Sequence, residues 1–228
     1  MNRGRRHQTQ QKPGYTAGSR LETRRLHPRL QQYISRALSL VGGIPDERKR
    51  ALGRVSAFVA AKRATGDAAE LVFICTHNSR RSQMGQLWAA AAAAHFKIDG
   101  VLAYSGGTEA TAFNPRAVAA MRKAGFVIEN PGGDNPRYRV TFDENGSVIE
   151  CFSKQYRDPP NPASGFAAIM TCSDADEACP VVVGASLRVP IPYEDPKSAD
   201  GKSDESDRYD ARCLQIGTEM LYLFSRAS

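Results

Sequence analysis

A cysteine and an arginine six residues apart could together act on an oxyanion. Cys75 and Arg81 form a C-x5-R pattern between the apolar run 71–74 and a helix predicted from about residue 83. A loop that leads from a buried strand to a helix N-terminus points successive backbone N–H groups inward and forms a nest for a tetrahedral anion. Such a position stabilises a thiolate, and the guanidinium of Arg81 could bind two anion oxygens at once.

The residues between and after this pair are polar, which suits an anion-binding loop. Asn78 tolerates a left-handed backbone conformation, and Ser82 could hydrogen-bond the thiolate. Ser105, before a Gly-Gly pair, could support the nest. We expect the oxyanion to contact the loop residues Thr76, His77, Asn78, Ser79, Arg80, Arg81 and Ser82.

The C-x5-R pattern occurs twice, so its context has to decide between the copies. The second copy runs from Cys151 to Arg157, after a predicted hairpin strand. It lacks Ser or Thr after the arginine, and the prolines at 159 and 160 forbid a helix there. We therefore place the anion loop at Cys75 and interpret Cys151 and Cys213 as structural. A structural, buried thiol stays the alternative for Cys75.

A nucleophile that attacks an oxyanion ester needs a general acid for the leaving oxygen. Asp195, which precedes Pro196 and follows a predicted strand, is the candidate. The other interpretation is an ordinary Asx-Pro turn. Taken together with Cys75, the position favours the acid.

Apolar strand patterns alternate with helical patterns over most of the chain, which favours a mostly parallel α/β sheet. The sequence predicts four core strands, at 71–74, 101–105, 166–170 and 187–191. It predicts helices at 29–41, from 45, at 83–95, 114–121 and 206–224, and a β-hairpin over 137–152. Ligands bind at the carboxyl ends of parallel strands, which is where the loop at Cys75 would lie.

Length, charge and composition restrict the class of protein. The chain has 228 residues, 41% hydrophobic and 24% charged, which is ordinary for a globular protein. No apolar run reaches the ~20 residues needed to cross a membrane. The net charge of +7 arises within residues 1–30, so the remainder is neutral and gives no sign of a nucleic-acid partner. We expect a disordered basic tail over 1–27, a helical hairpin over 28–66 and a catalytic domain over 67–228.

The cysteines point to a reducing compartment. Their number, 5, is odd, and the N-terminus shows no apolar signal-peptide segment. These features predict a cytoplasmic chain whose cysteines serve chemistry more than structure. The histidines do not pair with the cysteines at zinc spacing, so we predict no metal site.

The segment from Phe73 to Met84 resembles the signature loop of the low-molecular-weight protein tyrosine phosphatase superfamily, and within it most of all the thioredoxin-coupled arsenate reductases. Three further segments match that branch, at 104–109, 114–121 and 170–180. The resemblance covers about residues 70–226, with an insertion near 131–160. It implies a three-layer α/β/α fold with a mostly parallel four-stranded sheet, like that of phosphotyrosine protein phosphatase I. His77 and Arg80 depart from the family loop, which commonly has Gly and Cys there.

The resemblance also implies a relay of three thiols. Cys75 would attack arsenate, Cys172 would attack Cys75 and release arsenite, and Cys179 would resolve the Cys75–Cys172 disulfide. Thioredoxin would then reduce the Cys172–Cys179 bond. A helix between the last two would place them about 10.5 Å apart, too far for a disulfide, so residues 173–178 would have to unwind. Two separate buried thiols are the other interpretation of this pair.

Three functions follow as hypotheses. The first is an arsenate reductase with thioredoxin as electron donor and without a tightly bound cofactor. The second is a phosphatase that hydrolyses phosphotyrosine through a Cys75 phosphoenzyme, with Asp195 protonating the leaving phenolate. The third is a non-catalytic oxyanion-binding or interaction module, which the joint presence of Cys75, Arg81 and Asp195 disfavours.

Overall fold

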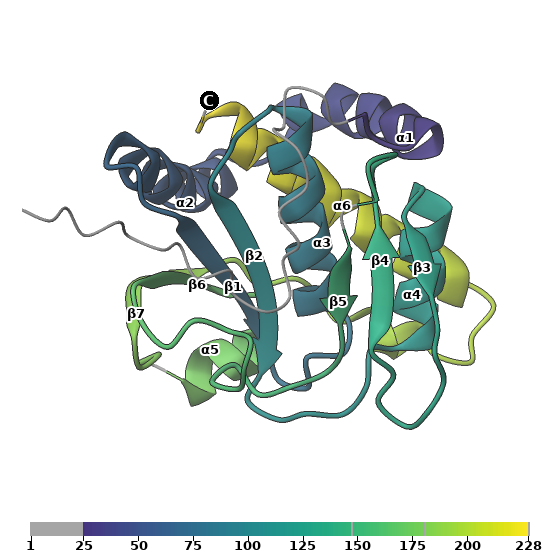
Figure 1. Ribbon diagram of the computed structural model, residues 1–228. Coiled ribbons are helices and arrows are strands. Elements are labelled where there is room, and N and C mark those ends of the chain that lie inside the picture. Colours follow the sequence, from purple (N-terminus) through teal and green to yellow (C-terminus); the bar gives the residue numbers. More distant parts are fainter. Residues whose placement is uncertain (1–24, 147, 180, 228) are drawn as a thin grey trace, which may run out of the picture.

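A four-stranded parallel sheet forms the centre of the molecule. The computed structural model describes residues 25–146, 148–179 and 181–227. The sheet consists of β1 (Ala69–Cys75), β2 (Val101–Gly107), β6 (Phe166–Met170) and β7 (Ala185–Pro190), in the order β2-β1-β6-β7 (Figure 1). Every neighbouring pair is parallel. All four predicted strands are therefore confirmed.

The helices predicted at 83–95, 114–121 and 206–224 are present, whereas no periodic pattern predicted the short helix at 173–178 or the 3-10 turn at 196–199. The sheet is accompanied by α3 (Arg81–His95), α4 (Pro115–Ala124), α5 (Ser173–Ala178), α6 (Glu205–Ser225) and the 3-10 turn η3 (Pro196–Ala199). Local signals explain their ends, as α4 illustrates. The Asn114 side chain accepts the backbone N–H of Arg116 at its start, and Gly125 ends it with a φ of 107°. None of the helices in the described ranges is long and apolar enough to cross a membrane.

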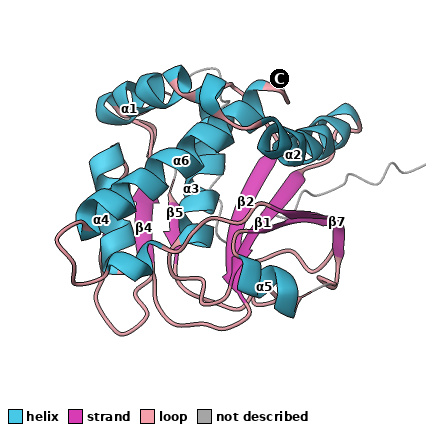
Figure 2. Ribbon diagram, turned by 180° about the vertical axis from the view of Figure 1, so that it is seen from behind, coloured by secondary structure: helices cyan, strands magenta, loops and turns pink. Residues whose placement is uncertain are grey.

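The two faces of the sheet are covered unequally. Leu71 and Phe73 of β1 belong to a large core shared with α3, α4 and α6. Val72 and Ile74 alternate with them along the strand and belong to a smaller core that includes Ala175 of α5. The expected α/β/α arrangement is confirmed, with the second helical layer reduced to α5 and loop segments (Figure 2).

The N-terminal helices share the large core of the sheet. α1 (Pro28–Ser39) and α2 (Asp46–Ala64) are joined by the 3-10 turn η2 (Val41–Gly43) and form the predicted helical hairpin. Leu30 and Leu52 are fully buried in the same core as Trp88 of α3. Hydrophobic burial therefore ties this hairpin to the rest of the fold.

The predicted tail falls mostly on residues 1–24, which lie outside the described residues. Its last residues are described and are part of the fold. Leu26 is buried and forms an isolated bridge with Asp143, and the backbone N–H of His27 donates to the carbonyl of Phe142 at 3.0 Å. This part of the chain thus lies against the inserted β-structure.

The insertion forms a small second sheet beside the main one. β4 (Tyr138–Thr141) and β5 (Ile149–Cys151) form the predicted hairpin, and β3 (Val127–Glu129) pairs with β4 on its other side. All pairs are antiparallel. After β5 the chain returns to the main sheet, where Gln155 forms an isolated parallel bridge with Gly107 at the end of β2. The insertion therefore reaches the carboxyl edge of the main sheet.

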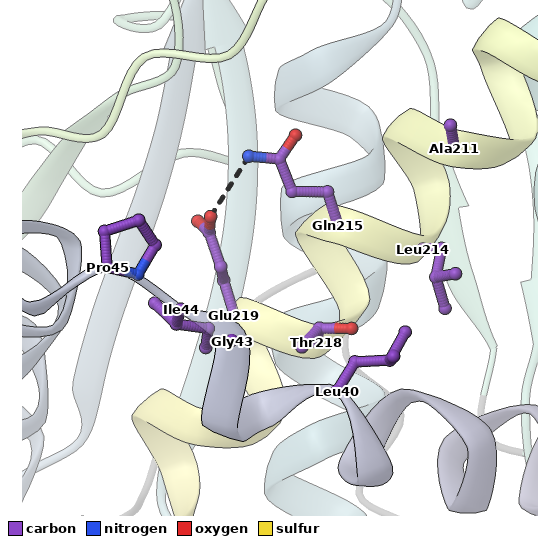
Figure 3. Close-up of a pocket in the computed structure, with 9 residues that line it drawn as sticks. All are labelled: Leu40, Gly43, Ile44, Pro45, Ala211, Leu214, Gln215, Thr218 and Glu219. Atoms are coloured by element: carbon purple, nitrogen blue, oxygen red, sulfur yellow. Dashed lines mark hydrogen bonds between the residues drawn. The ribbon is translucent and has the colours of Figure 1, made fainter.

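A hollow of about 340 Å³ lies between the helical hairpin and α6 (Figure 3). Its lining residues are Leu40, Gly43, Ile44, Pro45, Ala211, Leu214, Gln215, Thr218 and Glu219. The Gln215 amide donates to Glu219 at 3.2 Å within it. None of the residues predicted to carry chemistry lines this hollow, so the candidate site has to be sought at the carboxyl edge of the sheet.

The shared core predicts that the helical hairpin unfolds together with the sheet. Leu52→Ala should lower the free energy of unfolding by about 2–5 kcal/mol, because it leaves a cavity in the core. Leu40→Ala is the matched control, since Leu40 is 45% exposed. The control should change stability by less than about 0.5 kcal/mol. Urea unfolding followed by circular dichroism and by Trp88 fluorescence measures both variants. A Leu52→Ala protein as stable as the parent would contradict the shared core.

Candidate active site

The loop from Cys75 to Arg81 leads from the carboxyl end of β1 directly into α3. Asn78 adopts a left-handed conformation with a φ of 46°, as its residue type allows. Gly107, at the end of β2, lies against the loop: a Cβ there would come within 2.5 Å of the Thr76 carbonyl oxygen and 2.8 Å of the Asn78 nitrogen. A glycine is therefore required beside the loop.

The backbone of this loop is turned so that its carbonyl groups point away from the centre. Cys75 O and Thr76 O accept from the N–H groups of Thr108 and Glu109. The carbonyls of His77, Asn78 and Ser79 accept, respectively, from Ser153 Oγ, Gln83 Nε2 and the Asn114 N–H. The backbone N–H groups of residues 76–79 have no acceptor in the described part of the chain. Free, inward-facing amides of this kind are the geometry of a nest.

A chain of hydrogen bonds directs a proton donor at the Cys75 sulfur. The backbone N–H of Lys154 donates to Asn78 Oδ1 at 3.0 Å, which leaves the Asn78 Nδ2 group to donate to Ser82 Oγ at 2.8 Å. Because Ser82 Oγ already accepts that bond, its own proton is available for Cys75 Sγ, 3.1 Å away. Asn78 and Ser82 are completely buried. The Ser82 hydroxyl is thus placed directly against the Cys75 sulfur.

Arg81 and Asp195 form an ion pair across the mouth of the loop. Arg81 Nη2 lies 2.7 Å from Asp195 Oδ2, and Nη1 donates to the Tyr193 carbonyl at 2.9 Å. Arg81 Nε is buried and has no partner among the described residues. Asp195 also accepts the Lys197 N–H at the start of η3, so the Asx-Pro turn considered from the sequence is present as well. An anion that binds to the Arg81 guanidinium therefore has to compete with the Asp195 carboxylate for its N–H groups.

Arg80 and His77, the two departures from the family loop, point away from the nest. Arg80 Nε donates to the Tyr209 hydroxyl at 2.9 Å, and its guanidinium is 3.7 Å from Asp200 and 3.9 Å from Asp195. The half-exposed His77 ring lies 3.6 Å from Glu109. Both residues belong to the loop predicted from the sequence, but their side chains bind protein partners at its rim.

Cys172 lies next to the loop at the carboxyl end of β6. Its sulfur is 3.6 Å from Thr76 Oγ1, and it accepts the Ala175 N–H at 3.4 Å as the N-cap of α5. Cys172 is buried in the same cluster as Cys75. Cys179 follows the other end of α5 and is partly exposed. The described structure thus brings Cys75 and Cys172 to neighbouring strand ends and separates Cys179 from Cys172 by a wound helix.

The two remaining cysteines lie in the large core. Cys151 and Cys213 are completely buried, and burial raises the pKa of each thiol to about 12, because a thiolate is poorly solvated there. Cys213 Sγ accepts the Trp88 indole N–H at 3.3 Å in the large core. These surroundings agree with the structural role predicted for both residues. Ser105, which we expected to support the nest, is paired with Phe73 on the neighbouring strand. Its hydroxyl has no hydrogen-bond partner among the described residues.

Two residues of the insertion support the loop and were missed by the sequence analysis. Ser153 Oγ donates to the His77 carbonyl at 2.8 Å and accepts the Thr111 N–H at 2.8 Å. The backbone N–H of Lys154 orients Asn78 as described above. Both lie inside the second C-x5-R copy, which the sequence analysis treated only as a chance match. Neither contact leaves a local signal, since the partners are 76 residues apart.

Comparison with known proteins identifies relatives of this chain. No family model matches the chain. The arsenate reductase of Bacillus licheniformis is 32% identical over 135 residues, which cover 59% of this chain and 79% of the relative. The arsenate reductase of Bacillus subtilis is 31% identical over the same shares of the two chains.

Solved structures with a related chain path include an arsenate reductase in the oxidised state, at 21% identity and a TM-score of 0.47. That match covers 70% of this chain and 98% of the other. A low-molecular-weight phosphotyrosine phosphatase from Vibrio cholerae has 15% identity and a TM-score of 0.46, with 69% and 95% covered. On the 32% identity to a relative that it covers over 79% of its length, this chain belongs to the enzyme family of these arsenate reductases.

Proposed function

We propose that the protein reduces arsenate to arsenite through Cys75, Cys172 and Cys179, with thioredoxin as the electron donor. The observation that carries the proposal is the position of Cys172. Its sulfur lies 3.6 Å from the hydroxyl of Thr76, the residue directly after the proposed nucleophile. Phosphoryl transfer needs only one thiol, whereas two-electron reduction needs a second thiol within reach of the first.

In the first step, the Cys75 thiolate attacks arsenic and displaces one oxygen as water or hydroxide, which forms a sulfur–arsenic(V) bond. The inward amides of the loop and the Arg81 guanidinium bind the remaining oxygens. Arg81 exchanges its bond to Asp195 for one to the substrate. The hydrogen bond from Ser82 stabilises the attacking sulfur anion.

In the second step, the Cys172 thiolate attacks the Cys75 sulfur. The electron pair of the sulfur–arsenic bond goes to arsenic, which leaves as arsenite, and a Cys75–Cys172 disulfide forms. Cys172 is prepared for this by the Ala175 N–H, which donates to its sulfur at 3.4 Å. The two electrons gained by arsenic are those lost by the two thiols.

In the third step, Cys179 attacks the Cys172 sulfur and releases Cys75 as a thiolate. Thioredoxin then reduces the Cys172–Cys179 disulfide through its own pair of thiols. Val181 and Val183, just after Cys179, are 73% and 63% exposed. They offer apolar surface for a docking protein. A reducing cytoplasm is the compartment in which this cycle would run.

Hydrolysis of phosphotyrosine is the second candidate, and Asp195 favours it. Its carboxyl group lies beside Arg81, where the leaving oxygen of an aryl phosphate would emerge. Phosphorus in phosphate resists the two-electron reduction, so a phosphoenzyme on Cys75 would end in hydrolysis. Both reactions share the loop, and only the reductase requires Cys172 and Cys179.

The thiols should differ sharply in reactivity. In the folded protein at pH 7, iodoacetamide should modify Cys75, and phosphate or arsenate should protect it because the anion fills the nest. Cys151 and Cys213 should stay unlabelled, since burial raises the pKa of each to about 12. Peptide mass spectrometry after timed quenching measures each site. Labelling of Cys75 that is slow and indifferent to both anions would argue against the nest.

Removal of the second and third thiols separates the two candidate reactions. Cys172→Ser and Cys179→Ser should abolish multiple-turnover arsenate reduction with thioredoxin, because the relay cannot be completed. Aryl-phosphate hydrolysis should survive in both variants. Cys213→Ser is the matched control, since that thiol lies in the core. Unchanged arsenate turnover in the first two variants would refute the relay.

Asp195→Asn tests the proton donor. If the Asp195 carboxyl protonates the leaving phenolate, kcat for aryl-phosphate hydrolysis should fall by about 10²–10⁴-fold, the usual contribution of a positioned acid. Substrates with very acidic leaving groups should be affected much less, because they need no protonation. A uniform fall of less than about threefold over all leaving groups would remove this role.

A further inference from the structure

Arg188 of β7 binds the carboxyl end of α5 through three hydrogen bonds. Its Nη2 lies 2.7 Å from the backbone oxygen of Asp176 and 2.5 Å from Asp176 Oδ1. Its Nε donates to the carbonyl of Cys179 at 3.1 Å. In the strand register Arg188 pairs with Ala168, whose side chain faces the smaller core, so Arg188 lies on the face of the sheet that α5 covers.

These contacts supply what a six-residue helix lacks. The last carbonyls of any helix have no partner within it, and so short a helix is not stable alone. Asp176 O and Cys179 O are such terminal carbonyls, and both find the Arg188 guanidinium. At the other end, Cys172 Sγ accepts the Ala175 N–H. The helix is thus held at its start by the thiol of Cys172 and at its end by an arginine bound to the backbone carbonyl of Cys179.

The hydrogen bonds of Arg188 are compatible with only one redox state of the pair. A disulfide requires the Cα atoms of Cys172 and Cys179 to approach within about 7 Å, whereas a helical rise over seven residues separates them by about 10.5 Å. The described structure has both thiols free. To form the bond, α5 has to unwind, and the Cys179 carbonyl has to leave the guanidinium.

We propose that Arg188 is a positioning residue that holds Cys172 and Cys179 apart as dithiols and thereby sets the redox equilibrium of this pair. The proposal rests on the relay of the proposed function. It gives the order of events a physical cause: Cys172 stays available for Cys75 while the helix is wound, and Cys179 reaches Cys172 only after the Arg188 contacts have broken. Loss of Arg188 lets the two thiols pair early, which withdraws Cys172 from the reaction with Cys75.

The test measures the equilibrium of the pair alone. In a Cys75→Ser background, the protein is equilibrated at pH 7 with oxidised and reduced dithiothreitol. The two thiols lose two electrons and two protons to oxidised dithiothreitol, which becomes the reduced form. Acid quenching, alkylation and peptide mass spectrometry then give the fraction of Cys172–Cys179 disulfide.

Arg188→Ala should shift the equilibrium toward the disulfide by about tenfold, which corresponds to about 30 mV for a two-electron couple. Arg188→Lys keeps the positive charge but loses the forked guanidinium. It should shift the equilibrium toward the disulfide by about threefold. The control is Arg208→Ala, whose guanidinium pairs with Asp204 on the exposed side of α6 and should leave the equilibrium unchanged. If Arg188→Ala fails to fold, as judged by circular dichroism, Arg188→Lys decides. Values within twofold of the parent for the folded variants overturn the proposal.

Failure of this proposal and failure of the relay give different results. The equilibrium is measured without arsenate and without Cys75, so it does not depend on turnover. An equilibrium that shifts, combined with arsenate turnover that survives Cys172→Ser, leaves the assignment of Arg188 standing and removes the relay. An unchanged equilibrium, combined with turnover that needs both thiols, removes the role of Arg188 and keeps the relay.

Discussion

The site depends on one constraint, the direction of the peptide groups between Cys75 and Arg81. Every carbonyl from Cys75 to Ser79 is bound by a group outside the loop, so the amides have to face the centre. The left-handed Asn78 makes the turn possible, and its buried side chain connects the backbone to Ser82 and the sulfur. Oriented amides in a water-poor site bind an anion without reorganisation, which is why such loops serve catalysis.

The insertion is part of this constraint. Ser153 binds the His77 carbonyl, and the Lys154 N–H orients Asn78. Gly107 forms an isolated bridge with Gln155 of the same segment. Because these contacts come from the backbone and one hydroxyl, they fix geometry without adding charge to the nest. The segment that follows the inserted hairpin thus supplies hydrogen-bonding groups to the loop. The helical hairpin contributes differently, through hydrophobic burial in the large core.

Two arginines change partners at different steps of the proposed cycle. Arg81 binds Asp195 in the structure, and in the proposed cycle it exchanges this contact for one to the substrate. Arg188 binds the end of α5 in the structure, and in the proposed cycle it releases the Cys179 carbonyl when the disulfide forms. In both cases a planar guanidinium binds more than one oxygen at once. These hydrogen bonds fix the arrangement before the reaction, and the next step has to break them. In the proposed cycle, anion binding thus breaks the contact between Arg81 and Asp195, and disulfide formation breaks the contact between Arg188 and the Cys179 carbonyl.

The sequence by itself determined the four core strands, the inserted hairpin, the five long helices and the place of the loop at Cys75, because hydrophobic periodicity and the strand–loop–helix context are local properties of the chain. It also placed Arg81 and Asp195 at the same edge of the sheet, since the carboxyl ends of parallel strands share one edge. Only the tertiary structure decided which side chains face the nest, turning Arg80 toward Tyr209 and His77 toward Glu109. It alone revealed Ser153, Lys154 and Arg188, because their contacts are long-range or made by the backbone, which no residue pattern records.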